Sequence, residues 1–228
     1  MTLTAFAEGV WLDTGPMSVL GMRLSATMTV LRLGDAGLLL VSPLEMTKER
    51  RDAVESLGQV SHLYSPNLFH HLRIGEWANA FPSARVHAPP GLVKKRPDLR
   101  IDRVHRGRMD PAFNGWIDEL VIEGFRLEES ALFYRPGQTL VVADLVQNIG
   151  RPEHWWAKVY SRTMGFYDCV ALSRAIRWSA FSDRGAARRG IEQVLERPFE
   201  RLVMGHGAPL ETGGREALAA AYRWLLRS

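Results

Sequence analysis

The sequence predicts a mixed α/β protein that folds as one domain over residues 1–228. Short apolar runs rich in β-branched residues and bounded by Gly, Pro or Asp predict strands. Segments with apolar residues three and four positions apart predict helices. The length is sufficient for one sizeable core, and a composition of 46% hydrophobic and 24% charged residues is typical of globular proteins.

The N-terminal part is predicted to be mostly strand. The predicted strands lie at residues 17–22, 27–33 and 38–41. Together they predict a meander, and the glycine-rich segment from Gly34 to Gly37 predicts the hairpin turn between the last two. Thr47 is the predicted N-cap of a helix that reaches about Leu57 and is stopped by Gly58.

Strands and helices alternate in the middle of the chain. The predicted strands lie at residues 60–64, 85–88, 116–122, 131–134 and 139–143. Helical spacing predicts a helix from Ile74 to Phe81, closed by Pro82. The Pro-Pro-Gly sequence at 89–91 predicts a break followed by a polar loop through Asp98. The sequence Arg135-Pro136-Gly137-Gln138 predicts a turn with Pro in its second and Gly in its third position.

The C-terminal third is predicted to be mostly helical. The predicted helices lie at residues 153–162, 169–181, 183–195 and 215–226. Ser182 is the predicted N-cap of the third. A last strand is predicted at 201–204, and Gly205-His206-Gly207 follows it. Glycines on both sides allow a sharp turn that we expect to expose the imidazole.

Composition and charge argue against several functions. The formal charge is +4 and the pI is about 9.5, but the basic residues are spread along the chain with modest clusters at 94–96 and 184–189. No aromatic-interleaved repeat accompanies them, so we expect solvated surface and no nucleic-acid partner. No run approaches the roughly 18 apolar residues that would span a bilayer, and no membrane partner is expected.

The start of the chain and its cysteine content indicate the compartment. The first residues lack the basic region and long apolar region of a signal peptide. Cys169 is the single cysteine and cannot form an internal disulfide, as in a reducing compartment. We therefore expect a cytoplasmic protein, in which Cys169 is a small buried hydrophobe.

Candidate metal ligands follow three of the predicted strands. His70 and His71 end the loop that begins at Ser65, Asp144 ends the strand at 139–143, and His206 follows the strand at 201–204. Imidazoles with one carboxylate suit Zn²⁺, Fe or Mn²⁺, and an incomplete ligand shell leaves a position open for water. Bound metal lowers the pKa of water from about 15.7 to about 7. The adjacent histidines by themselves favour exposed imidazoles in the first turn of a helix over a metal site.

The order of these elements resembles the metallo-β-lactamase superfamily. A histidine-bearing loop comes near residue 70, an aspartate ends a strand near the middle, and Gly-His-Gly lies near the end. Four parts of the chain resemble one branch of this superfamily more closely, a branch known only as a domain of unknown function. They are residues 65–71, 81–84 with 89–91, 139–144 and 205–207. The resemblance covers nearly the whole chain. It implies a four-layer αββα sandwich with a metal site at one edge of the two sheets.

The loop motif of that superfamily, His-x-His-x-Asp-His, is degenerate in this chain. One alignment puts at its four defined places the residues Ser65, Asn67, Phe69 and His70. The other puts there Pro66, Leu68, His70 and His71. Either alignment lacks the two loop histidines of the first metal. The resemblance implies that the second metal keeps His70 or His71, the bridging Asp144 and the terminal His206.

A further histidine, expected before the strand that carries the aspartate, also has no counterpart. Glu128 and Glu129 lie in that region and supply carboxylates instead. The resemblance, with these departures, therefore implies at most one metal rather than a dinuclear centre.

Our leading hypothesis is a hydrolase of a small ester, amide or phosphoester with a reduced, mononuclear site. The expected metal ligands are His70, His71, Asp144 and His206, of which Asp144 and His70 are the expected catalytic residues. The expected cofactor is one divalent metal, with zinc favoured over manganese or iron, and the expected partner is a small molecule. The sequence does not indicate the oligomeric state.

Two alternatives differ in class. The fold could persist without catalysis, leaving a binding or regulatory protein that needs no metal, because half of the ligand set is missing. Ser65, Asp144 and His206 also occur in the chain order of an α/β-hydrolase triad. However, Ser65 lacks the Gly-x-Ser-x-Gly elbow that exposes such a nucleophile, which disfavours the triad.

Overall fold

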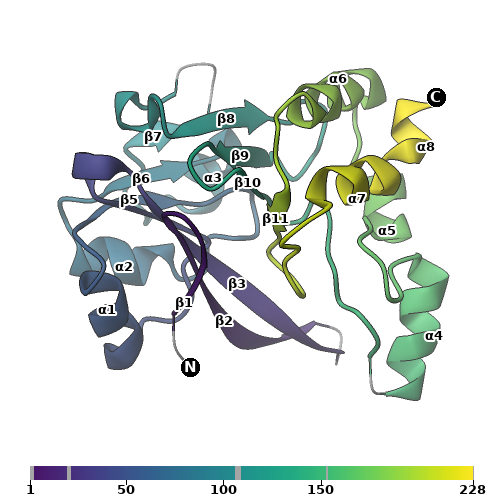
Figure 1. The fold of residues 1–228 in the computed structure, drawn as a ribbon, viewed down its shortest axis with the longest axis horizontal. Coiled ribbons are helices and arrows are strands. Elements are labelled where there is room, and N and C mark those ends of the chain that lie inside the picture. Colours follow the sequence, from purple (N-terminus) through teal and green to yellow (C-terminus); the bar gives the residue numbers. More distant parts are fainter. Residues whose placement is uncertain (1–2, 20–21, 106–108, 153, 228) are drawn as a thin grey trace.

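Two β-sheets pack face to face, with helices on the outer face of each (Figure 1). The structure, a computed structural model, describes residues 3–19, 22–105, 109–152 and 154–227. The N-terminal half of the chain builds one sheet with its helices, and the C-terminal half builds the other (Figure 1).

The first sheet has seven strands in the order β1-β2-β3-β4-β5-β6-β7. Its strands are β1 Thr4–Ala7, β2 Val10–Val19, β3 Met22–Arg32, β4 Leu38–Val41, β5 Val60–Tyr64, β6 Arg85–Ala88 and β7 Arg103–Val104. Strands β1 to β4 pair antiparallel, whereas β4 to β7 pair parallel. The hairpin turn between β3 and β4 is thus confirmed, and the antiparallel meander is present, although its strand boundaries differ from those predicted.

The second sheet has four strands in the order β11-β10-β9-β8. Its strands are β8 Ile117–Val121, β9 Ser130–Tyr134, β10 Thr139–Val141 and β11 Arg201–Val203. Strands β10 and β11 are parallel, so their carboxyl ends lie side by side. The helices are α1 Lys48–Glu55, α2 Ile74–Ala80, α3 Pro90–Lys95, α4 Trp155–Met164, α5 Arg174–Ser179, α6 Arg184–Leu195, α7 Gly214–Ala221 and α8 Arg223–Leu226, with short 3₁₀ turns at Gly34–Ala36 and Pro111–Phe113.

Successive side chains along the inner strands point to opposite faces of their sheet, which shows which face packs against the other sheet and which against helices. On β4, Leu39 and Val41 pack between the sheets, whereas Leu38 and Leu40 pack against α1 and α2. On the second sheet, Leu132 and Val141 face the first sheet, and their neighbours Phe133 and Leu140 pack beneath α6, α7 and α8. Strands β4, β9 and β10 are buried on both faces, and β4 accordingly is a continuous apolar run. The predicted αββα sandwich is confirmed.

Local signals explain where most elements begin and end. The Thr47 side chain caps α1 by accepting a hydrogen bond from the Arg50 N–H, as predicted. The Pro-Pro-Gly break is present, since β6 ends at Ala88, but the loop predicted after it was wrong. Pro90 opens α3, because proline at the first helical position gives up an N–H that has no helical partner. Ser182 is not the cap of α6, since Asp183 accepts the Ala186 N–H instead.

Other boundaries differ from the prediction. The predicted strand at 17–22 spans parts of two paired strands, because β2 ends at Val19 and β3 begins at Met22. Of the predicted helix at 169–181, only α5 is helical. The helix predicted at 153–162 is α4, which begins at Trp155, and Glu153 lies outside the described residues. In the 135–138 turn the positive φ, 43°, belongs to Gln138 and not to the glycine. Cys169 is exposed rather than buried.

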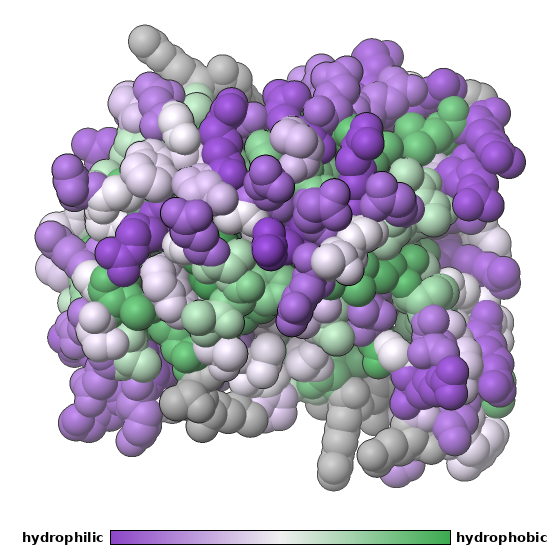
Figure 2. All heavy atoms as spheres, in the orientation of Figure 1, coloured by the Kyte–Doolittle hydropathy of each residue, from purple (hydrophilic) through white to green (hydrophobic). Residues whose placement is uncertain are grey.

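The surface is mixed. Figure 2 shows hydrophilic residues over most of one face, with smaller apolar areas between them. Exposed large apolar side chains in the described part of the chain are Phe69, Leu72, Val93, Val104, Trp155, Val159 and Trp178. Among the described helices, none has the length and apolar character needed to cross a membrane.

We expect Leu40→Ala to lower the free energy of unfolding by about 2–5 kcal/mol, because the side chain is fully buried between β4 and the outer helices. Leu72→Ala, at a side chain that is 74% exposed, should change stability little. Urea unfolding followed by far-UV circular dichroism measures both. Equal losses in the two variants would contradict the assignment of layers.

Candidate metal centre

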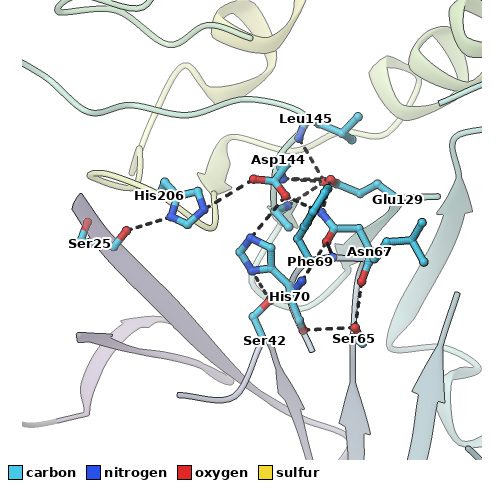
Figure 3. Close-up of polar contacts among 12 residues, drawn as sticks. Ser25, Ser42, Ser65, Asn67, Phe69, His70, Glu129, Asp144, Leu145 and His206 are labelled. Atoms are coloured by element: carbon cyan, nitrogen blue, oxygen red, sulfur yellow. Dashed lines mark hydrogen bonds and ion pairs between the residues drawn. The ribbon is translucent and has the colours of Figure 1, made fainter. Parts of the chain in front are cut away.

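Three segments that are far apart in sequence meet at one edge of the two sheets. They are the loop after β5, which carries His70, the segment after β10, which carries Asp144, and the segment after β11, which carries His206 (Figure 3). One ligand atom from each of the three lies within 4.8 Å of the others. The Asp144 carboxylate is central, with its Oδ2 3.5 Å from His70 Nε2 and its Oδ1 3.5 Å from His206 Nε2.

The protonation of His206 follows from its partner. Its Nδ1 lies 3.0 Å from the main-chain oxygen of Ser25, which can only accept a hydrogen bond, so Nδ1 carries a proton. Burial lowers the pKa of His206, and the neutral ring then has a lone pair on Nε2. That lone pair faces the Asp144 carboxylate across 3.5 Å, so two acceptors face each other. A cation between them would satisfy both.

His70 is oriented by the first sheet. Its Nδ1 lies 3.1 Å from the Ser42 hydroxyl, at the end of β4. Burial opposes protonation of His70, but the charge of Asp144 and its hydrogen bond outweigh burial and raise the pKa. Ser42 has a φ of 52°, a left-handed conformation that costs energy in a non-glycine residue and recurs at functional sites.

Glycine at position 205 leaves room for this imidazole. A Cβ there would lie 2.5 Å from Cε1 of His70 and 3.0 Å from the Ala143 oxygen. Gly207 has a φ of 91°, and a Cβ would collide with the Asn148 main chain. The two glycines thus permit a close approach and a sharp turn. His206 itself is 8% exposed, so the expectation of an exposed imidazole was wrong.

Asp144 stays ionised despite its surroundings. Burial would raise the pKa of this carboxyl, but the charge of His70 and the hydrogen bonds from His70 and Asn67, together with the charge that His206 gains once it is protonated in acid, lower it to about 2. The side chains of His70, Asp144 and His206 are 9%, 14% and 11% exposed, so each has a small solvent-accessible area.

Asn67 links the loop to the two carboxylates beneath it. Its Oδ1 accepts the N–H groups of Phe69 at 2.9 Å and His70 at 3.0 Å, which fixes the orientation of the amide. Its Nδ2 then donates at 2.8 Å to Asp144 Oδ2 and at 2.8 Å to Glu129 Oε2 (Figure 3). All hydrogen-bonding groups of the Asn67 side chain thus have partners.

Glu129 supports the segment that carries Asp144. It is fully buried, and its carboxylate accepts the main-chain N–H groups of Ala143, Asp144 and Leu145 at distances from 2.8 to 3.2 Å. Burial, and then the charge of Asp144, raise the pKa of Glu129 to about 7. Glu128 turns away and accepts the Gly91 N–H at 2.6 Å. Neither glutamate belongs to the group of converging ligand atoms among the described residues.

Two other sequence-predicted residues lie elsewhere. His71 Nδ1 accepts from Arg96 Nη1 at 3.2 Å, and its main-chain oxygen accepts the N–H of Ile74 at the start of α2. The structure therefore does not bring His71 to the other ligands. The Ser65 hydroxyl lies 3.0 and 3.1 Å from the main-chain oxygens of Asn67 and His70, where it has no contact with His206.

Sequence reasoning missed the role of Asn67. The available signal was local: an asparagine directly after proline commonly bonds the main chain two residues ahead and organises a tight turn. No local pattern could show that its amide reaches residues 62 and 77 positions away.

The sequence matches no family model, and no curated protein is significantly similar to it. Solved structures are similar in fold. A metallo-β-lactamase from Pontibacter korlensis superposes with a TM-score of 0.67 at 12% identity, covering 99% of each chain. For a metallo-β-lactamase from Hirschia baltica the TM-score is 0.66 at 12% identity, covering 98% of this chain and 96% of that one.

A metal-soaked flavodiiron core from Synechocystis superposes with a TM-score of 0.68 at 11% identity, over 99% of this chain and 60% of that one. Identities this low bear on architecture alone. The two sheets, their outer helices and these superpositions show that the chain has the metallo-β-lactamase fold.

Proposed function

We propose that the chain binds one divalent cation between His70, Asp144 and His206 and hydrolyses a small ester, amide or phosphoester. The observation that carries the proposal is the convergence of one ligand atom from each of these three residues. At His206, Nδ1 lies 3.0 Å from the Ser25 main-chain oxygen, which leaves Nε2 to face the Asp144 carboxylate at 3.5 Å. Two imidazoles and one carboxylate suit zinc first, and iron or manganese next. Three protein ligands leave a further coordination position open, as in catalytic rather than structural zinc sites.

The donor set supports one cation rather than two. The Asn67 amide lies between Asp144 and Glu129, and its N–H groups donate to both carboxylates. It therefore occupies the place where these two carboxylates could have held a second ion. An N–H donor cannot coordinate a cation. The amide already supplies the positive dipole between the two carboxylates.

A divalent cation in such a site supplies Lewis-acid polarisation and lowers the pKa of water. The residues of the chain contribute orientation and charge. Asp144 is ionised throughout the neutral range and can accept the hydrogen bond that aligns a water molecule. Because both Asp144 and His70 would contact the cation, we assign both to catalysis. The narrow exposure of the three side chains favours a small substrate.

We expect His70→Ala and His206→Ala each to remove one equivalent of zinc from the full-length chain, because each takes away one imidazole ligand. His71→Ala is the matched control, since His71 bonds Arg96 outside the group. Zinc content is measured by mass spectrometry on protein prepared without a histidine tag. Unchanged zinc in His206→Ala, or loss in His71→Ala, would contradict the assignment.

Cation affinity should fall with decreasing pH, because His70 must lose its proton to become a ligand. The pKa of His70 is raised in the free protein, so protonation competes with the cation from a higher pH than an ordinary histidine pKa of about 6.5 would give. Isothermal titration with zinc between pH 5.5 and 8.5 tests this. An affinity that is independent of pH across this range would refute it.

Asn67→Ala should weaken zinc binding about 10–100-fold, because the hydrogen bond that aims Asp144 Oδ2 is lost. The substitution also leaves Asp144 and Glu129 without the donor between them. Competition with a chromophoric chelator measures the affinity, and circular dichroism checks that the fold persists. Wild-type affinity in a folded Asn67→Ala protein would exclude a positioning role.

The zinc-loaded protein is expected to hydrolyse a member of a panel of esters, lactones, amides and phosphodiesters. Asp144→Asn should abolish that activity, because the substitution removes the carboxylate charge at the centre of the site. Zinc binding without turnover on the whole panel would instead favour a binding or regulatory protein with this fold.

A further inference from the structure

A second cluster of buried ionisable residues lies on the inner face of the first sheet, away from Asp144. His62 on β5 and His87 on β6 are 4% and 2% exposed. Asp110, which precedes the 3₁₀ turn at Pro111–Phe113, is 3% exposed. The Phe113 ring covers the two imidazoles, with centroid distances of 5.4 Å to His62 and 5.0 Å to His87. The proposed hydrolytic site uses none of these residues.

The ligand atoms of this cluster converge. One atom each from His62, His87 and Asp110 lies within 4.8 Å of the other two. His62 Nδ1 and His87 Nε2 are 2.9 Å apart, with the rings tilted by 44°. Two nitrogens bound to one tetrahedral zinc at 2.0–2.1 Å are separated by about 3.4 Å, so a shift of about half an ångström would accommodate the ion.

Both imidazoles are in the form that binds metal. Burial lowers the pKa of His62 and, with the neighbouring His62, lowers that of His87 to about 3. The neutral pair can place one proton between Nδ1 and Nε2, whereas a cation would engage the lone pairs of both. Asp110 adds a carboxylate whose Oδ1 is already held by the Ala112 N–H at 3.0 Å.

A surface hollow of about 510 Å³ leads to the cluster. It is lined by Ser61, His62, Ser83, Arg85, Arg103 and Asp110. The hollow gives the entry path that a metal site requires, and a water molecule could fill a fourth position beside the three protein ligands.

Two arginines are the competitors of a cation. Arg85 Nη1 lies 3.1 Å and Arg103 Nε 3.4 Å from Asp110 Oδ2. Their side chains are 54% and 41% exposed, so each guanidinium can turn into solvent without leaving a buried charge. The binding of a cation at Asp110 must therefore displace at least one arginine, which lowers the affinity.

We propose that His62, His87 and Asp110 form a second site for a divalent cation, zinc by ligand type, that ties the segment around Asp110 to strands β5 and β6. Phe113 closes the site on the side of the core. It is separate from the His70, Asp144 and His206 group, and its zinc is weaker bound because Arg85 and Arg103 compete for the carboxylate.

Two substitutions with opposite expected effects on zinc affinity test the proposal in the chain of residues 1–228. Asp110→Asn removes the ligand charge and should eliminate the weaker class of zinc sites in isothermal titration at pH 7.5. Arg85→Gln removes a competing cation at an exposed position and should tighten that same class at least threefold. His206→Ala should leave this class unchanged, since it alters the other group.

A second readout does not depend on titration. Saturating zinc should raise the melting temperature of wild-type and His206→Ala protein, and the rise should be smaller in Asp110→Asn. Each variant is compared with its own metal-free sample, so a change in intrinsic stability does not affect the result. Identical zinc stoichiometry and identical melting shifts in wild type and Asp110→Asn, or no tightening in Arg85→Gln, would overturn the proposal.

Discussion

The candidate site depends on the hydrogen bonds that the Asn67 amide donates to two buried carboxylates. Asp144 and Glu129 both accept from its Nδ2 at 2.8 Å. Without that donor, two neighbouring carboxylates would oppose each other in a region of low dielectric constant. Because the Oδ1 of the same residue accepts the His70 N–H, one side chain fixes both the aspartate and the histidine that faces it. Partially satisfied buried networks are costly, which makes every member of this one necessary.

The network also sets the charges of the site. The pKa of Asp144 is lowered to about 2, so this carboxylate is ionised at neutral pH. The pKa of Glu129, in the same buried region, is raised to about 7. Burial lowers the pKa of His206, whereas at His70 the charge of Asp144 outweighs burial and raises the pKa, so the two imidazoles differ in their tendency to hold a proton. A cation would replace the contact between His70 Nε2 and Asp144, whereas Asn67 could still donate to Asp144 Oδ2. The difference between the imidazoles links the architecture of the loop to the proposed metal chemistry.

Much of the fold was predictable because its strands carry strong local signals. The strands β4, β5 and β6 are short runs bounded by Gly, Ser or Pro, and their predicted ranges are those observed. The errors concern features that local patterns describe poorly. Pro90 both breaks the preceding chain and opens α3, and the paired strands β2 and β3 have ends that the apolar pattern does not mark. For the candidate site, the sequence singled out Asp144 and His206 from their positions after strands, and the structure brings both together with a loop histidine.

The sequence by itself determined most strand and helix segments, because apolar periodicity and turn residues are local signals. Its resemblance to the metallo-β-lactamase superfamily also indicated the sandwich and the three segments that meet. The sequence could not decide between His70 and His71, because their directions depend on hydrogen bonds to distant residues. Asn67, anchored 62 positions away at Glu129, turns His70 toward Asp144, while Arg96 and the start of α2 hold His71. Nor could it show that His62, His87 and Asp110 converge, because strand pairing and the 3₁₀ turn create that cluster. Only the tertiary structure decided these side-chain positions.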